Sequence, residues 1–179
     1  MYNDIVTITQ EPKIFGDQDF LDTFRFENGY PFPPSYTAFC NELGYGKLCD
    51  LFLIYIPMGD HPDSWVVQYK KMKGLFDYYL DPPLFAIREA EGGTDLIANA
   101  IPFARSENGE FLFWDIRHPQ PHGEFPVYFT DFSTGIRPAG NSLTTFIKNV
   151  SGEATFKSVL KFYQKPLEAS FQGFKELIW

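Results

Sequence analysis

The sequence predicts an α+β fold, in which a central antiparallel or mixed β-sheet is flanked by helices. Three observations lead to this class. Apolar residues recur at helical spacing near both ends of the chain, short apolar runs lie between them, and an Asn-Gly pair separates two of those runs. With 179 residues, of which 44% are apolar and 18% aromatic, the chain holds enough hydrophobic material for a single packed domain over residues 1–179.

Apolar residues at every third or fourth position predict two helices in the first half of the chain. The first begins at Pro33, where the missing N–H costs nothing, and ends at Gly44, which suits a left-handed stop. The second covers residues 65–79, with Asp63 or Ser64 as its cap. Its aromatic residues lie at core spacing, so we expect them to pack rather than to bind a ligand.

The C-terminal part of the chain is also expected to be helical. A helix is predicted at residues 143–150, after Asn141 or Ser142. Residues 153–179 carry two further stripes and should form a helical addition to a core of about residues 32–150. The stripes are Phe156, Val159, Leu160 and Tyr163, then Leu167, Phe171, Phe174 and Ile178.

The middle of the chain has the pattern of strands, with short apolar runs bounded by turn residues. Asn108-Gly109 lies between two such runs, which is a strong hairpin signal. Short turns of this kind join antiparallel strands. Because helices are expected at both ends of this run of strands, we expect a sheet with helices over one face. A short helix is expected around residues 19–26. The predicted strands cover residues 51–56, 84–87, 96–103, 110–116 and 127–132.

Most of the net charge of −8 lies in the middle of the chain, where thirteen acidic and six basic residues occur between Asp50 and Asp131. Nucleic-acid backbones are bound by clustered Lys and Arg, so this balance argues against a nucleic-acid partner. It permits steering of a basic protein partner, although solubility alone would also explain it. The sequence shows no membrane span and no signal peptide, and we expect a cytoplasmic protein.

Candidate catalytic groups are sparse. The sequence has no GxSxG elbow, and Cys40 and Cys49 lie outside any CxxC pattern, so both are expected to be buried free thiols. Asp115 and Asp131 are the carboxylate pair to consider for hydrolysis. Turn or surface hydrogen bonds are the simpler role for both, and no catalytic residue is assigned.

Asp115, His118 and His122 are the best candidates for a metal site, because imidazole and carboxylate groups suit zinc. However, Pro119 and Pro121 prevent the helix that would align the two histidines. An exposed loop without a metal is therefore expected. The glycine-containing turns lack the Lys or further Gly of phosphate-binding loops, so no cofactor site is predicted.

Four motifs follow one another in a characteristic order. They are Phe32-Pro33-Pro34-Ser35-Tyr36-Thr37-Ala38-Phe39 with Gly44-Tyr45-Gly46; Ile101-Pro102-Phe103-Ala104 leading to Phe113-Trp114-Asp115; Pro126-Val127-Tyr128 with Asp131; and Ser142-Leu143-Thr144-Thr145-Phe146-Ile147. In this order they resemble the SUKH superfamily, which contains bacterial toxin-immunity proteins and fungal cell-wall-synthesis regulators of the Smi/Knr type.

The resemblance implies an α+β fold and a protein-binding role without catalysis or cofactor, since many members inhibit toxin domains such as nucleases or deaminases. The leading hypothesis is an immunity protein, monomeric or homodimeric, whose partner is a basic toxin domain. A regulatory scaffold of the fungal type and a hydrolase using a carboxylate pair are the alternatives. The expected contact residues are Asp60, Asp63, Glu107, Glu110, Asp115 and Glu124.

Overall fold

The structure is a computed structural model that describes residues 1–80 and 93–175. Its strands are β1 (Thr7–Gln10), β2 (Gly46–Leu48), β3 (Phe52–Ile54), β4 (Ala100–Ser106), β5 (Phe111–Asp115), β6 (Val127–Thr130), β7 (Ile136–Gly140) and β8 (Ser170–Gly173). Its helices are α1 (Gln18–Thr23), α2 (Pro34–Glu42), α3 (Trp65–Tyr79), α4 (Gly93–Ala98), α5 (Leu143–Ser151) and α6 (Phe156–Val159), with 3₁₀ turns η1 (Tyr2–Asp4) and η3 (Pro121–Gly123).

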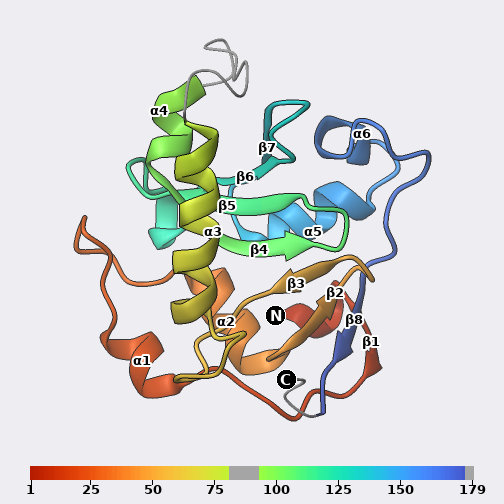
Figure 1. Ribbon diagram of the computed structural model, residues 1–179. Helices are drawn as coiled ribbons and strands as arrows, with labels where there is room; N and C mark the ends of the chain where they lie inside the picture. The colour runs from red at the N-terminus through yellow and green to blue at the C-terminus, as the bar shows by residue number, and fades with distance from the viewer. Residues whose placement is uncertain (81–92, 176–179) are drawn as a thin grey trace.

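The strands form one sheet in the order β1-β8-β2-β3-β4-β5-β6-β7 (Figure 1). β1 and β8 are parallel, and the other neighbouring strands are antiparallel. The predicted α+β class, with a mixed sheet flanked by helices, is therefore confirmed. No described helix has both the length and the apolar character that a membrane crossing requires.

The main helices form where the sequence predicts them, at α2, α3 and α5. Ser142 caps α5 by accepting a hydrogen bond from the Thr145 N–H at 3.1 Å. Ser64 stands at the N-cap position of α3, but its hydroxyl accepts the Met58 N–H at 2.9 Å and so fixes the preceding loop instead. Gly44, after α2, has a φ of +69°, the left-handed conformation expected of a stop residue.

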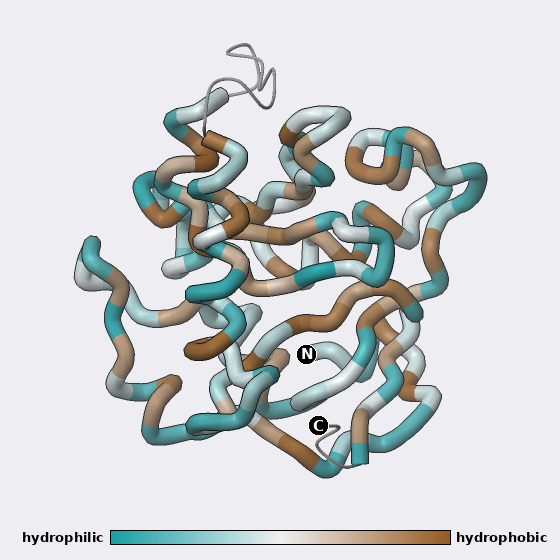
Figure 2. Tube along the Cα trace, in the orientation of Figure 1, coloured by the Kyte–Doolittle hydropathy of each residue, from teal (hydrophilic) through white to brown (hydrophobic). Residues whose placement is uncertain are grey.

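Helices cover both faces of the sheet, so the expectation that they cover one face is wrong. Successive side chains of a strand point to opposite faces. On β5, the rings of Phe111 and Phe113 contact Phe76 of α3, at centroid distances of 5.6 and 5.4 Å. Trp114 points the other way and contacts Tyr36 of α2 at 4.9 Å. All five residues of β5 are buried, so this strand needs cover on both faces, and most of them are apolar (Figure 2).

One row of directly paired residues crosses all eight strands and shows where this cover stops. Its members are Gln10, Gln172, Lys47, Leu53, Arg105, Phe111, Thr130 and Ile136, from β1 to β7 in sheet order. Phe111, Thr130 and Ile136 are buried, with the Phe111 ring against Phe76 of α3, whereas Arg105 and Gln172 are exposed. The half of this face formed by β1, β8, β2 and β3 therefore has no helix above it among the described residues.

The predicted helical stripe at residues 167–178 is wrong, because this segment forms β8. Phe171 is buried and Gln172 is exposed, which is the alternation of a strand. The Phe171 ring meets Phe39 of α2 at 5.6 Å. β8 lies between β1 and β2, so the C-terminal segment completes the sheet rather than adding a helix to it.

The strand expected at residues 96–103 begins later than predicted, because Leu96 and Ile97 belong to α4. The Asn99 N–H and its side-chain amide both donate to the Asp95 carbonyl, at 3.2 and 2.8 Å, which closes a helical turn before β4. The Asn108-Gly109 hairpin joins β4 to β5 as predicted. The strand expected at 84–87 lies outside the described residues.

Candidate partner-binding surfaces

Glu110, one of the six acidic residues expected at the partner interface, is only 8% exposed. Its carboxylate accepts hydrogen bonds from the Tyr163 hydroxyl at 3.0 and 3.2 Å. The same hydroxyl accepts a hydrogen bond from the Asn108 amide at 2.9 Å. Glu110 thus fastens the segment after α6 to the β4–β5 hairpin, and its charge is directed inward.

Asp115 is 3% exposed and lies at the end of β5. It accepts hydrogen bonds from Arg117 Nε at 2.8 Å and Nη2 at 3.0 Å, and its second oxygen lies 3.1 Å from His118 Nδ1. Burial alone would raise the pKa of Asp115, but the hydrogen bonds from Arg117 and His118 outweigh it and hold the pKa below its usual value. Arg117 also pairs with Asp95 at 2.5 Å.

Glu124 joins two helices. Its carboxylate accepts the Ser35 N–H and the Ser35 hydroxyl, each at 2.7 Å, at the start of α2. The Leu143 N–H at the start of α5 donates to the same hydroxyl at 3.1 Å. Burial raises the pKa of Glu124, and the two bonds from Ser35 offset this only in part.

The remaining three predicted contacts lie apart from these. Asp63 accepts a hydrogen bond from the Tyr45 hydroxyl at 2.5 Å. Glu107 is exposed and pairs with Lys47 at 3.4 Å, while Asp60 is exposed at a turn before α3. The structure therefore does not bring the six carboxylates together, and five of them, all except Asp60, accept internal hydrogen bonds.

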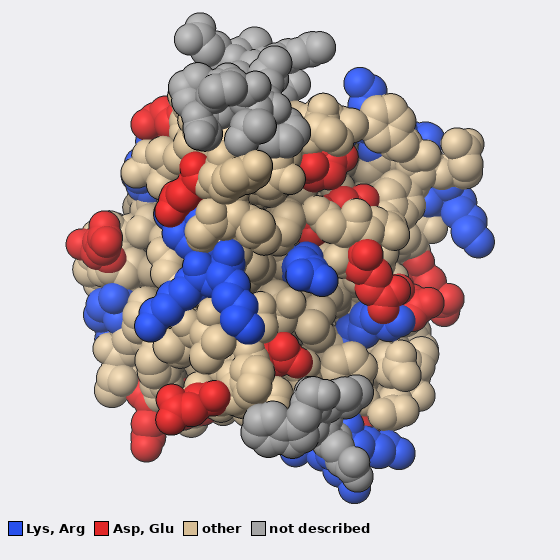
Figure 3. All heavy atoms as spheres, viewed as in Figure 1, with Lys and Arg blue, Asp and Glu red and all other residues tan. Residues whose placement is uncertain are grey.

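An acidic patch that the sequence interpretation missed includes one of those six residues. Its members are Asp17, Asp19, Asp22 and Asp60, all exposed and none in an ion pair with a described residue. The Asp17 N–H donates to the Pro57 carbonyl at 2.9 Å, which holds α1 beside the turn that bears Asp60. Acidic atoms gather over α1 at the lower left of the molecule (Figure 3). The available signal was three Asp within residues 14–24, without a Lys or Arg.

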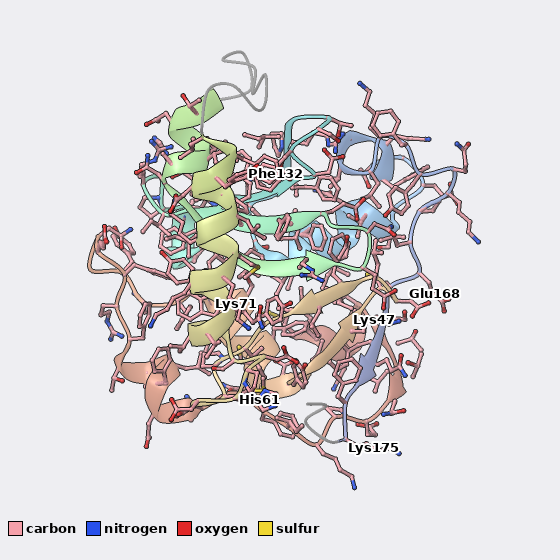
Figure 4. All side chains as sticks on the ribbon, in the orientation of Figure 1. Lys47, His61, Lys71, Phe132, Glu168 and Lys175 are labelled. Atoms are coloured by element: carbon pink, nitrogen blue, oxygen red, sulfur yellow. The ribbon has the colours of Figure 1, made fainter. Side chains whose placement is uncertain are left out.

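Basic side chains lie across the middle of the same view (Figure 3). Lys70 and Lys71 are exposed on α3, and Arg105 is exposed on β4. None of the three forms an ion pair with a residue of the described ranges. Figure 3 shows basic atoms across the middle of this face, and Figure 4 places Lys71 on α3 and Lys47 on β2.

A cleft of about 600 Å³ opens between the segment after α1, helix α3 and the ends of β4 and β5. One wall is the stretch Phe24-Arg25-Phe26-Glu27-Asn28, which follows the acidic patch directly. Trp65 and Tyr69 of α3 form the opposite wall, their rings stacked at 5.1 Å. Trp65 is further packed edge-on against Phe24 at 5.4 Å. An apolar floor with a polar rim is the usual composition of a binding cleft.

The candidate hydrolytic pair is not brought together. Asp131 follows Thr130, which pairs with Phe111 at one end of the β5–β6 ladder, whereas Asp115 lies at the other end of β5. Four strand residues at about 3.4 Å each separate the two ends by about 14 Å. Glycosidase carboxylates lie about 5–9.5 Å apart, so this pair cannot share one substrate bond.

The structure joins two members of the candidate metal set, since His118 contacts Asp115, but His122 sits in η3 with a φ of +64°. No group of three His, Cys, Asp or Glu side chains suited to a metal occurs within residues 1–80 and 93–175. Cys40 and Cys49 are free and buried, as predicted. Burial raises the pKa of Cys49 to about 12 and that of Cys40 still further, so neither is a ready nucleophile.

The comparisons with known proteins identify the family. The sequence model described as SMI1 / KNR4 family (SUKH-1) matches residues 17–149, which run from α1 to α5. No curated protein and no solved structure matches the chain. The matched range contains the acidic patch and all the residues that line the cleft, and it excludes β1 and β8. This range is well over half of the chain, and the protein belongs to the SMI1/KNR4 family (SUKH-1).

Proposed function

We propose that this protein is a non-catalytic binding domain that neutralises a toxin domain, of nuclease or deaminase type, by occupying its basic surface. Family membership supports a role in immunity or regulation. The observation that carries the proposal is the acidic patch of Asp17, Asp19, Asp22 and Asp60, which lies beside an aromatic cleft. Protein interfaces commonly combine an aromatic anchor site with a charged rim.

The acidic patch would act mainly on the rate of association. Its carboxylates lack internal cationic partners among the described residues, so their field extends into solvent. Nucleic-acid-cleaving toxins are basic where they hold phosphates. Opposite charges on two surfaces raise the association rate constant and reject acidic partners, and salt weakens both effects.

The direct test is to express the chain together with the open reading frame next to its gene, and to measure rescue of growth and formation of a complex. Growth arrest that the chain does not relieve, with no complex on purification, would contradict immunity. Capture of the neighbouring protein without toxicity would instead support the regulatory scaffold.

The role of the acidic patch in association is tested with two variants of equal net charge. Asp19→Asn/Asp22→Asn/Asp60→Asn removes three carboxylates from the patch. Asp4→Asn/Glu153→Gln/Glu168→Gln removes three exposed carboxylates elsewhere. We expect the first variant to slow association about tenfold or more at low salt and the second to change it little. Equal slowing in both would mean that only the total charge matters.

The regulatory scaffold is kept as a second candidate because the molecule shows two surfaces of opposite sign. Basic atoms lie across the middle of the face that Figure 3 shows, and acidic atoms gather over α1 at its lower left. A basic toxin would be repelled by the basic surface, whereas an acidic regulatory partner would be attracted. Two partners that bind the same chain at once would favour this function.

A further inference from the structure

The cleft contains a carboxylate that forms no ion pair with a described residue. This is Glu27, which lines the cleft and is exposed. The other charged groups of the lining are engaged. Lys73 pairs with Asp77 at 3.0 Å, and Arg117 bridges Asp95 and Asp115.

Arg25 is the remaining cation of the lining, and its guanidinium points back to the chain. Its Nη1 donates to the main-chain carbonyls of Asp22 and Phe24, at 2.8 and 2.6 Å. Among the described lining residues Glu27 is the one carboxylate, and it forms no ion pair with a described residue. Burial raises the pKa of Tyr69, and the nearby charges of Glu27 and Asp77 raise it further.

The aromatic rings of the cleft also favour a positively charged ligand. Tyr69 is half-buried and offers the ring that a ligand meets first, while Trp65 behind it is 3% exposed. Aromatic faces attract cations within about 6 Å of the ring centroid, and guanidinium more often than ammonium. Phe24 and Ile101 give the apolar surface that the methylene stem of an arginine would cover.

We propose that the cleft receives an arginine side chain of the protein partner, with its guanidinium between Glu27 and the Tyr69 ring. This rests on the proposed function, because it names the anchor by which a basic partner is held. The acidic patch would bring the partner close, and the cleft would then recognise one side chain and slow dissociation.

The experiment measures binding of short peptides to the whole chain by NMR, and it needs no toxin. The probes are acetyl-Gly-Arg-Gly-amide, the same peptide with norleucine, and the same peptide with glutamate. We expect saturable shifts in the amide signals of residues 24–28 and Tyr69 with the arginine peptide only. Equal binding of norleucine would show an apolar groove, and stronger binding of glutamate would show that the cations dominate. Either result overturns the proposal.

Two variants with matched controls localise the effect. Glu27→Gln should weaken the arginine peptide about two- to fivefold, as for an exposed ion pair, while Glu153→Gln leaves it unchanged. Tyr69→Leu should weaken it further, while Tyr78→Leu, on the exposed side of the same helix, should not. If no peptide binds although the chain still neutralises its toxin, the cleft proposal fails and the proposed function stands.

Discussion

Replacing Phe171 by Ala tests the unexpected placement of the C-terminal strand. The Phe171 side chain is fully buried on β8 and meets Phe39 of α2 edge-to-face at 5.6 Å. Removing a buried phenyl ring costs about 3–5 kcal/mol, because apolar contacts are lost and a cavity remains. Domains of this kind have a total stability of about 5–15 kcal/mol, so the loss is a large part of it.

The assay is urea unfolding followed by circular dichroism. With a slope of about 2 kcal/mol per molar urea, the midpoint should fall by about 1.5–2.5 M. Phe162→Ala is the matched control, because that ring is 61% exposed in the same C-terminal segment, and its midpoint should move little. If both variants shift the midpoint equally by less than about 0.5 M, β8 does not pack into the core and the sheet order is wrong.

Three further predictions concern other parts of the chain. Gly74→Ala should stabilise the protein by about 0.5–1 kcal/mol in the same assay, because Gly74 lies inside α3 and an added Cβ meets nothing within 4 Å; a loss of stability would contradict the helical packing described. Because the pKa of Asp115 is lowered in the folded state, its contribution to stability is complete above about pH 4 and is lost as the pH falls further. Asp115→Asn should flatten this part of the stability–pH curve, and an unchanged curve would show that the bonds to Arg117 do not matter. Cys40 and Cys49 should react with a thiol reagent only on unfolding, and rapid labelling of the native protein would refute their burial.

The sequence predicted the elements that carry a long periodic signal. α2, α3 and α5 were found because these helices are at least nine residues long and carry apolar stripes. Their boundaries are also recognisable, such as Ser142 before α5 and Gly44 after α2. The β4–β5 hairpin was found because Asn108-Gly109 permits one kind of tight turn. These elements are determined by residues that are close together in the sequence, so the sequence alone is enough to predict them.

Elements that depend on distant partners were missed or misread. β2 has three residues, too few to show alternation, and it exists because β3 and β8 pair with it. β7 contains Pro138, which is tolerated since the strand lies at the edge of the sheet. At β8, spacing that fits a helix is overridden by two neighbouring strands.

The candidate site shows the same limit for charged residues. A sequence shows how many carboxylates a chain has, but it does not show which of them accept internal hydrogen bonds in the fold. Hydrogen bonds to Glu110, Asp115 and Glu124 come from groups up to 89 positions away in the sequence. The short acidic run at α1 carried a usable signal, because residues 14–24 hold three Asp and no Lys or Arg.

The insertion of β8 between β1 and β2 also constrains how the protein is made. The ribosome synthesises β1 long before β8. Thr7 can therefore pair with Ser170 only after that residue has left the exit tunnel. Until then β2 has an open edge, and unpaired strand edges invite association with other nascent chains. A chain whose synthesis stops early would therefore lose one whole side of its sheet, even though every residue of the family region were present.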